Sequence, residues 1–313
     1  MKRVLNFLLV LIGLSVVAVG ALYFIYPGVI LGAVTSMSVN NAGLEHRKVD
    51  IDGYQAHYYE GGSSNQTTLV LLHPFTEDKN SFVTSIRTLS QHYRVILPDL
   101  QGHGDNAQTL NLAYNMKRYS IKGQAHFINR LLLKLNANRV FIGGNEMGGH
   151  VALSYAANFS EQTLGLILIN SAGLNLGINN ESTYEPLPIS VSNSYFVDKF
   201  ARLYVTPPSY PKPVLQYLSN QLNPSINFFN SVLKQVEAGE DARLNQKALS
   251  IKAPALILWG QQDPVLGRAY AELIEHSLSN ATLKELANAG RSPQFEVPEL
   301  VGNEIKAFLD SAK

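Results

Sequence analysis

Phe141-Ile-Gly-Gly-Asn-Glu-Met-Gly-Gly-His150 is the stretch that decides the fold of this 313-residue chain. An apolar run that is typical of a buried strand ends in it, and a helical pattern starts from it. Its centre, Gly144-Asn-Glu-Met-Gly148, has the outline of the G-x-S-x-G turn, which lifts a reactive serine off the end of a strand. Here the central residue is Glu146, so the functional question is what a carboxylate does at that position.

Apolar runs on either side of this stretch alternate with helical patterns. We expect strands over 68–72, 93–97, 139–142 and 164–169, and helices over 81–90, 121–135 and 147–158. This alternation implies an α/β fold, with a mostly parallel sheet and helices on both of its faces. Ahead of it, residues 46–52 and 54–60 alternate around Asp52-Gly53 and predict a hairpin.

The regular alternation stops between residues 172 and 248, where proline pairs and aromatic residues dominate. This segment predicts short helices and loops without strands. The sheet pattern then resumes with strands over 255–259 and 282–286, a helix over 269–278, and a last helix from Pro298 to about 312. We therefore interpret 172–248 as a helical cap inserted into one domain that spans 45–312.

The N-terminus differs from the rest of the chain. Met1-Lys-Arg3 is basic, and residues 7–25 form an uncharged apolar run of 19 residues. Such a run can span a hydrocarbon core of roughly 30 Å. We predict a single-pass membrane anchor, a transmembrane helix within residues 1–30, with a cytoplasmic N-terminus and the domain on the extracytoplasmic side. The alternative is a cleaved signal peptide, which would leave a secreted or periplasmic protein. Residues 26–45 are interpreted as a partly apolar linker.

Composition removes several classes of function. The formal net charge is +1, which argues against a nucleic-acid surface. The chain has no cysteine, so thiol nucleophiles, disulfides and thiolate metal sites are excluded. We expect neither a cofactor nor a metal, because five histidines are scattered without the spacing of metal ligands. These are His46, His57, His92, His126 and His276.

Five segments with chemistry-bearing residues follow predicted strands of the parallel sheet. Ligands bind at this edge in open α/β sheets, and the five segments in this order form a strong signal. They are His73-Pro-Phe-Thr76, Asp99-Leu-Gln-Gly-His-Gly104, the turn around Glu146, Trp259-Gly-Gln-Gln-Asp263 and Gly290-Arg-Ser-Pro-Gln294.

In these segments the chain resembles the α/β-hydrolase superfamily, in particular its membrane-anchored lipases and monoacylglycerol-lipase-like esterases. The resemblance covers roughly residues 45–312. It implies that Glu146 stands at the nucleophile position, Asp263 at the acid position and Arg291 at the base position. It also implies that the backbone N–H groups of Phe75 and Met147 stand at the oxyanion-hole positions.

The chain departs from the family pattern at three of these places. The family has serine at position 146, histidine at 291 and glycine at 74, where this chain has Glu146, Arg291 and Pro74. Arginine stays protonated and cannot act as the base, and proline fixes φ near −65°. We therefore expect an inert Glu146–Arg291–Asp263 cluster, in which the guanidinium joins two carboxylates and the Glu146 carboxylate fills the oxyanion hole.

Three functions remain open from the sequence. We favour a catalytically inactive homologue that binds a lipid or acyl ligand, or a protein partner, in the pocket under its cap. The alternative is an active carboxylic-ester hydrolase with a non-standard site that uses Glu146, or His103 as a base. A third possibility is an interaction protein with a collapsed pocket. His73 and His103 are candidates for the pocket, and His73 is interpreted as a histidine that ties a loop.

Overall fold

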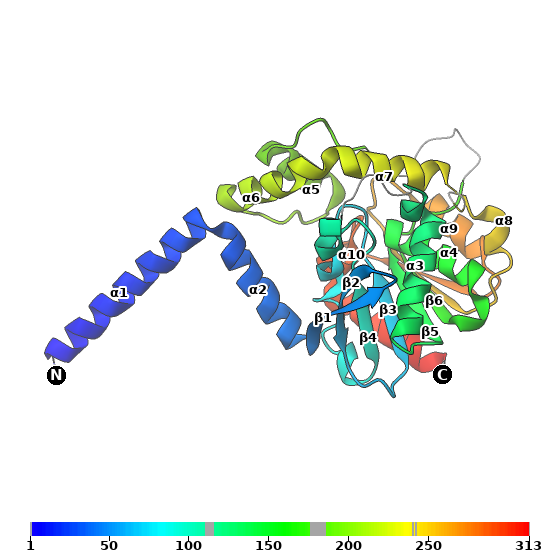
Figure 1. Ribbon diagram of the computed structural model, residues 1–313, viewed down its shortest axis with the longest axis horizontal. Coiled ribbons are helices and arrows are strands. Elements are labelled where there is room, and N and C mark those ends of the chain that lie inside the picture. The colour runs from blue at the N-terminus through cyan, green and yellow to red at the C-terminus, as the bar shows by residue number, and fades with distance from the viewer. Residues whose placement is uncertain (1, 110–115, 176–185, 240, 242, 313) are drawn as a thin grey trace.

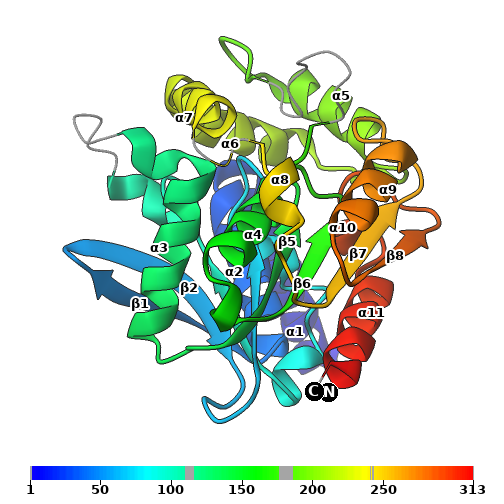
Figure 2. The ribbon, with the colours of Figure 1, turned by 90° about the vertical axis from the view of Figure 1, so that its right-hand side faces the viewer.

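An eight-stranded sheet forms the centre of the protein (Figure 2). The computed structural model describes residues 2–109, 116–175, 186–239, 241 and 243–312. The strands stand in the order β1-β2-β4-β3-β5-β6-β7-β8. Their bounds are β1 Leu44–Ile51, β2 Tyr54–Gly61, β3 Thr68–Leu72, β4 Arg94–Pro98, β5 Val140–Asn145, β6 Thr163–Ile169, β7 Ala255–Gly260 and β8 Ala281–Leu286.

The pairing of the strands confirms the predicted parallel sheet. β1 and β2 form the expected antiparallel hairpin, and β2 pairs with β4 antiparallel. The strands from β4 to β8 pair in parallel. All five residues of β3 are buried, because alternate side chains enter two separate apolar clusters. Val70 and Leu72 belong to one cluster, and Leu69 and Leu71 belong to the other. A continuous apolar run therefore reports burial on both faces of the sheet.

Helices cover both faces of the sheet. Residues of α3, α4 and α9 pack in one apolar cluster, and residues of α11 pack in the other. The helices are α1 Lys2–Ile25, α2 Pro27–Asn41, α3 Ile121–Lys134, α4 Met147–Asn158, α5 Asn193–Leu203, α6 Lys212–Leu222, α7 Ile226–Ala238, α8 Asn245–Ala248, α9 Arg268–Ser277, α10 Pro293–Glu296 and α11 Pro298–Ser311. Ser120 is the N-cap of α3, since its hydroxyl accepts a hydrogen bond from the Gly123 N–H at 3.1 Å.

Two predictions of local structure are wrong. Residues 81–90 form turns and the short 3₁₀ segments Lys79–Phe82 and Leu89–Gln91 rather than an α-helix. The hydroxyls of Ser81 and Ser85 donate to the carbonyls of Asp78 and Phe82, and such local bonds compete with helix formation. The segment interpreted as a linker is instead mostly helix α2, which starts at Pro27, a residue favoured in the first turn.

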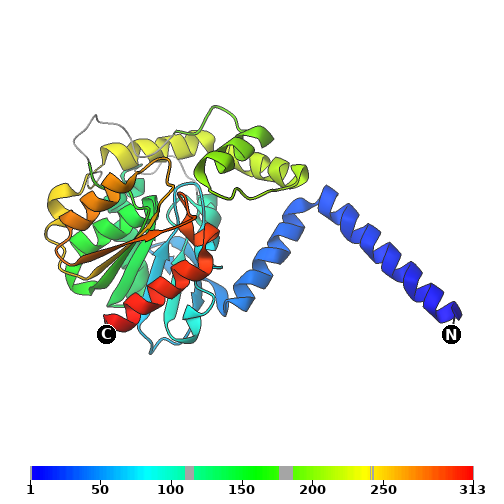
Figure 3. The same ribbon diagram turned by 180° about the vertical axis from the view of Figure 1, so that it is seen from behind.

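The N-terminal helices extend away from the sheet (Figures 1 and 3). α1 carries exposed apolar side chains such as Phe7 and Ile12, whereas Val39 near the end of α2 is buried in the core. Within the described part of the chain, no helix combines the length and the apolar character needed to cross a membrane. The transmembrane helix predicted from the run 7–25 is therefore not supported.

Helices α5 to α8 follow β6 in the sequence and precede β7. α5, α6 and α7 lie across one end of the sheet (Figure 1). This is the end at which the parallel strands finish, because side chains of α5 line the same cavity as Glu146. Residues 176–185, 240 and 242 of this segment lie outside the described residues.

Candidate active site

Glu146 stands in the sharp turn between β5 and α4. Its backbone has φ 52° and ψ −112°, a conformation that costs a non-glycine residue of order 1–3 kcal/mol. Three backbone hydrogen bonds hold this geometry. Glu146 N–H donates to Ile169 O, and Glu146 O accepts from the N–H groups of His150 and Ala172. The turn therefore projects one side chain off the end of β5, as its sequence predicts.

Glycines make this turn possible by allowing close backbone contacts. A Cβ on Gly144 would lie 2.4 Å from Leu72 O, and one on Gly148 would lie 2.0 Å from the same oxygen. A Cβ on Gly149 would lie 2.4 Å from Ser171 Oγ. Real Cβ atoms do not approach this closely, so the three glycines are required by the packing of the turn against β3 and against the loop that follows β6.

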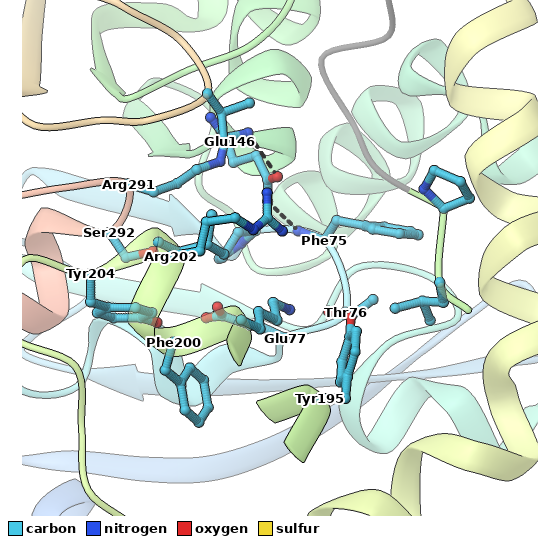
Figure 4. Close-up of a pocket in the computed structure, with 16 residues that line it drawn as sticks. Phe75, Thr76, Glu77, Glu146, Tyr195, Phe200, Arg202, Tyr204, Arg291 and Ser292 are labelled. Carbon is cyan, nitrogen blue, oxygen red and sulfur yellow. Dashed lines mark hydrogen bonds and ion pairs between the residues drawn. The ribbon is translucent and has the colours of Figure 1, made fainter. Parts of the chain in front are cut away.

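The Glu146 carboxylate has one partner on each oxygen (Figure 4). Phe75 N–H donates to Oε2 at 3.1 Å, and Arg291 Nη2 donates to Oε1 at 2.9 Å. The carboxylate makes no capping hydrogen bond to α4. Pro74 precedes Phe75 and has a fixed φ. The Phe75 N–H nevertheless points at the Glu146 carboxylate. Met147 starts α4 and its side chain is fully buried.

Arg291 joins Glu146 to Asp263. Its Nη1 lies 3.4 Å from Asp263 Oδ2, and the arginine side chain is 6% exposed. The Asp263 side chain is fully buried and also accepts from Asn170 Nδ2 at 2.8 Å and from two backbone N–H groups, those of Val265 and Leu266. Removing one partner from a guanidinium that is shared by two enclosed carboxylates strongly destabilises the fold, because a buried charge is left unpaired.

The loop that carries Arg291 is tied to the turn and to α5. Asn145 Nδ2 donates to Arg291 O at 3.1 Å, and Gln294 Nε2 donates to Asn145 Oδ1 at 3.0 Å. Arg291 N–H donates to Leu203 O at the end of α5. Glu296 accepts from the N–H groups of both Gly290 and Val205. These bonds fix the guanidinium relative to Glu146.

A cavity of about 120 Å³ opens beside Glu146. Its charged lining consists of three cations, Arg291, Lys199 and Arg202, and two carboxyls, Glu146 and Glu77. Aromatic side chains of Phe75, Tyr195, Phe200 and Tyr204 complete much of the wall (Figure 4). With more cations than anions and rings around them, the cavity suits a small ligand with an anionic group and an apolar part.

Glu77 is a titratable group of this cavity that the sequence did not reveal. Burial raises its pKa to about 7, against the hydrogen bond from Ser81 and the charge of Lys199, which lower it. Ser81 Oγ donates to Glu77 Oε2 at 2.7 Å. A carboxyl with a pKa near 7 can exist in either form at neutral pH.

The two histidines proposed for the pocket do not line it. His73 ties its loop as interpreted, because its Nδ1 bonds Pro74 O at 2.8 Å and its Nε2 accepts from Leu100 N–H at 2.9 Å. His103 packs its ring against those of His73 and Phe229 and bonds Gln101 O through Nδ1. Burial lowers the pKa of His73 to about 4 and that of His103 to about 3. Neither imidazole stands where it could take a proton from a group in the cavity.

Four residues of the site were missed from sequence alone. Asn170 follows β6, just as the predicted site residues follow their strands, so its position was a usable signal. Lys199 and Arg202 stand three residues apart on α5 and therefore share a face, but nothing in the sequence aimed that face at Glu146. Glu77 lies between the segment His73–Thr76 and the predicted helix 81–90, and neither pattern singled it out.

Curated relatives are similar over most of the chain. Monoacylglycerol lipase ABHD6 from Bos taurus is 26% identical over 319 residues, covering 96% of this chain and 92% of the relative. Lipase 1 from Psychrobacter immobilis is 26% identical over 276 residues, covering 86% of this chain and 85% of the relative.

Solved structures extend the similarity to the whole fold. A membrane phospholipase A, described as a bacterial virulence factor, superposes with a TM-score of 0.82 at 31% identity, covering 100% of this chain and 99% of that one. The family model of the alpha/beta hydrolase fold matches residues 67–298. The chain therefore belongs to the α/β-hydrolase fold family, as a lipase- and esterase-like member.

Proposed function

We propose that this protein is a lipase-like α/β-hydrolase homologue that binds the carboxylate group of an acyl ligand and does not hydrolyse esters. In this proposal Glu146 and Arg291 replace the serine and histidine of an active member, while Asp263 keeps the position of the acid. The observation that carries it is the pair of contacts on the Glu146 carboxylate, one to Phe75 N–H and one to Arg291.

The first contact concerns the oxyanion hole. The family uses the N–H at the Phe75 position to stabilise the negative oxygen of a tetrahedral intermediate. Here Glu146 Oε2 accepts that bond at 3.1 Å. A substrate carbonyl would have to displace a charged acceptor, which holds such a donor more strongly than a neutral oxygen does.

The second contact concerns nucleophile and base. Arg291 pairs with Glu146 at 2.9 Å, which lowers the availability of the carboxylate as a nucleophile. Because Arg291 remains protonated, it cannot activate a hydroxyl or a water molecule. Within the described residues, no histidine lines the cavity.

The cavity supports binding rather than turnover. Lys199 and Arg202 extend from α5 into its lining, and we propose that residues 172–248 act as the cap that presents them. A volume of about 120 Å³ is smaller than a typical ligand pocket of roughly 300 Å³ or more. It fits the carboxylate end of an acyl chain, and a longer chain would extend past the cap helices.

Hydrolysis and labelling test the inactive centre. We expect no turnover of short p-nitrophenyl esters by the wild-type chain and no labelling by a fluorophosphonate. The double variant Glu146→Ser, Arg291→His should gain labelling, while Glu146→Ser alone serves as the matched control without a base. Wild-type turnover that is lost in Glu146→Gln would refute the proposal in favour of a Glu146-based hydrolase.

Binding of octanoate tests the ligand class. Titration calorimetry should detect a complex of octanoate with the wild-type chain. The affinity should fall roughly tenfold or more in the double variant Lys199→Gln, Arg202→Gln, because the bound anion loses about 1.4 kcal/mol or more of binding free energy when its cationic partners are removed. Arg268→Gln, which removes an exposed arginine of α9, is the control and should bind as the wild type does. Equal affinity in all three chains would contradict the proposed site.

A further inference from the structure

The hairpin β1–β2 and the 3₁₀ segment η3 (Gly104–Thr109) bring two imidazoles and a carboxylate together outside the Glu146 cavity. His46 comes from β1, His57 from β2 and Asp105 from η3. One ligand atom of each lies within 4.8 Å of the other two. None of the three lines the cavity described above.

The pairing of the hairpin explains why the histidines meet. His46 stands opposite Tyr59 and His57 stands opposite Lys48. His46 and His57 are therefore diagonal neighbours on one face of the two strands, where long side chains reach one another. The sequence shows two histidines eleven positions apart, and only the register of the hairpin converts that separation into a contact.

Two of the three distances between the ligand atoms match the edges of a metal polyhedron. His46 Nε2 lies 3.3 Å from His57 Nδ1 and 3.3 Å from Asp105 Oδ2. Ligand atoms at the corners of a tetrahedron with zinc-ligand bonds of about 2.0–2.1 Å lie roughly 3.3 Å apart. We propose that His46 Nε2, His57 Nδ1 and Asp105 Oδ2 form a site for Zn²⁺ or a similar divalent transition metal, with a fourth position open to water.

The scaffold around these atoms holds them in place before a metal binds. The backbone N–H of His57 donates to Asn106 Oδ1 at 2.9 Å, and Tyr54 Oη donates to the backbone carbonyl of Asn106 at 3.2 Å. These two bonds join η3 to the hairpin. Asp105 N–H donates to Asp99 Oδ2 at 2.9 Å. Since the ligands come from segments that are already bonded, a metal needs little rearrangement.

Two ammonium groups and two carboxylates surround the proposed ligands. Lys79 Nζ lies 2.7 Å from both Asp105 Oδ2 and Asp99 Oδ2, and Lys48 stands opposite His57 in the hairpin. The formal charges around the site are therefore balanced before an ion binds. Metals bind imidazole in its neutral form. The Lys79 contact also orients the carboxylate, as partners of metal ligands commonly do.

The identity of the metal follows from the donor atoms. Two imidazole nitrogens and one carboxylate suit Zn²⁺, Ni²⁺ and Cu²⁺, whereas Mg²⁺ and Ca²⁺ prefer oxygen ligands alone. The bound ion would clamp η3 to the hairpin. Side chains of His46 and Asp105 are 46% and 42% exposed, so an ion has access from solvent.

The test uses the full chain without a histidine tag. A competition titration against a zinc-binding chromophore should give one Zn²⁺ per chain, and Co²⁺ should produce the absorption bands of a tetrahedral complex. Mg²⁺ should not compete. Zn²⁺ should also raise the Tm of the wild-type chain, because it binds the folded state selectively.

Three variants decide the assignment. His46→Gln and His57→Gln should each weaken Zn²⁺ binding by roughly a hundredfold and abolish the Co²⁺ bands, since each removes a ligand. His276→Gln, on exposed α9, should leave both unchanged. Retention of the Co²⁺ bands in either ligand variant, or absence of a one-to-one complex with the wild-type chain, overturns the site. Circular dichroism of each variant shows whether the fold persists, and the wild-type titration decides the matter where a variant does not fold.

Discussion

At the scale of single residues, Arg291 shows how buried charges depend on one another. Its guanidinium is 6% exposed and contacts both Glu146 and Asp263. A lone arginine at this depth would carry a large desolvation cost, and two facing carboxylates would repel each other. The opposite charges satisfy one another, which is why they were predicted to act as a cluster from the sequence.

Glu77 gives a pH-dependent prediction at the same scale. Its pKa of about 7 in the folded chain exceeds the ordinary 4.5, so the folded state binds more protons than the unfolded state between these values. The free energy of unfolding should therefore fall as pH rises from about 4.5 to 7, by on the order of 2 kcal/mol from this group.

The variant Glu77→Gln removes that dependence while keeping a hydrogen-bond acceptor for Ser81. Urea unfolding at pH 5 and pH 8 should show that the variant gains stability relative to wild type at the higher pH only. Glu272→Gln, which alters an exposed carboxylate of α9, is the matched control. An equal pH dependence in wild type and Glu77→Gln would argue against a buried, protonated Glu77.

At the scale of secondary-structure elements, the turn from β5 to α4 is the central feature. Sequence predicted both elements because the apolar period changes from that of a strand to that of a helix within a few residues. The structure adds that Gly148 faces Leu72 O, where a Cβ would lie at 2.0 Å. The strand-to-helix unit is thus packed against β3 through backbone atoms.

We predict that Gly148→Ala destabilises the fold by about 3 kcal/mol, since the methyl group forces β3 and α4 apart. Gly267→Ala, at the start of α9, is the control because nothing lies within 4 Å of its Cβ position, and its effect should stay within about 0.5 kcal/mol. Chemical denaturation measures both. Similar stabilities of the two variants would show that β3 can move away at little cost.

At the scale of the whole molecule, the N-terminal helix is an outlying element (Figure 1). Side chains of α1 such as Val4, Phe7 and Ile12 are 59–64% exposed. The following helix is anchored, because Gly28 packs against the Tyr217 ring and Ala42 is buried. A large exposed apolar surface on α1 promotes association.

Deletion of residues 1–26 should therefore convert a self-associating chain into a monomer in detergent-free buffer, as measured by size-exclusion chromatography with light scattering. The free energy of unfolding should change by less than about 1 kcal/mol, since the deleted side chains contribute little to the core. A deletion variant that is still self-associated, or no longer folds, would show that α1 contributes to the domain.

Sequence by itself determined the alternation of strands and helices, the hairpin, the strained turn at Glu146 and the pairing of Glu146 with Arg291. Each follows from local periodicity, from glycine spacing or from charge complementarity between residues whose strands end at one edge. It did not determine the conformation of residues 81–90, where serine hydroxyls bond the backbone locally, nor the helix α2.

Only the tertiary structure decided which distant side chains share a space. It placed Lys199 and Arg202 of α5 in the cavity, withdrew His103 from it, and brought His46, His57 and Asp105 within 4.8 Å of one another. These outcomes depend on strand register and on how helices pack across the sheet. Both are set by contacts between residues far apart in the chain, which local patterns do not encode.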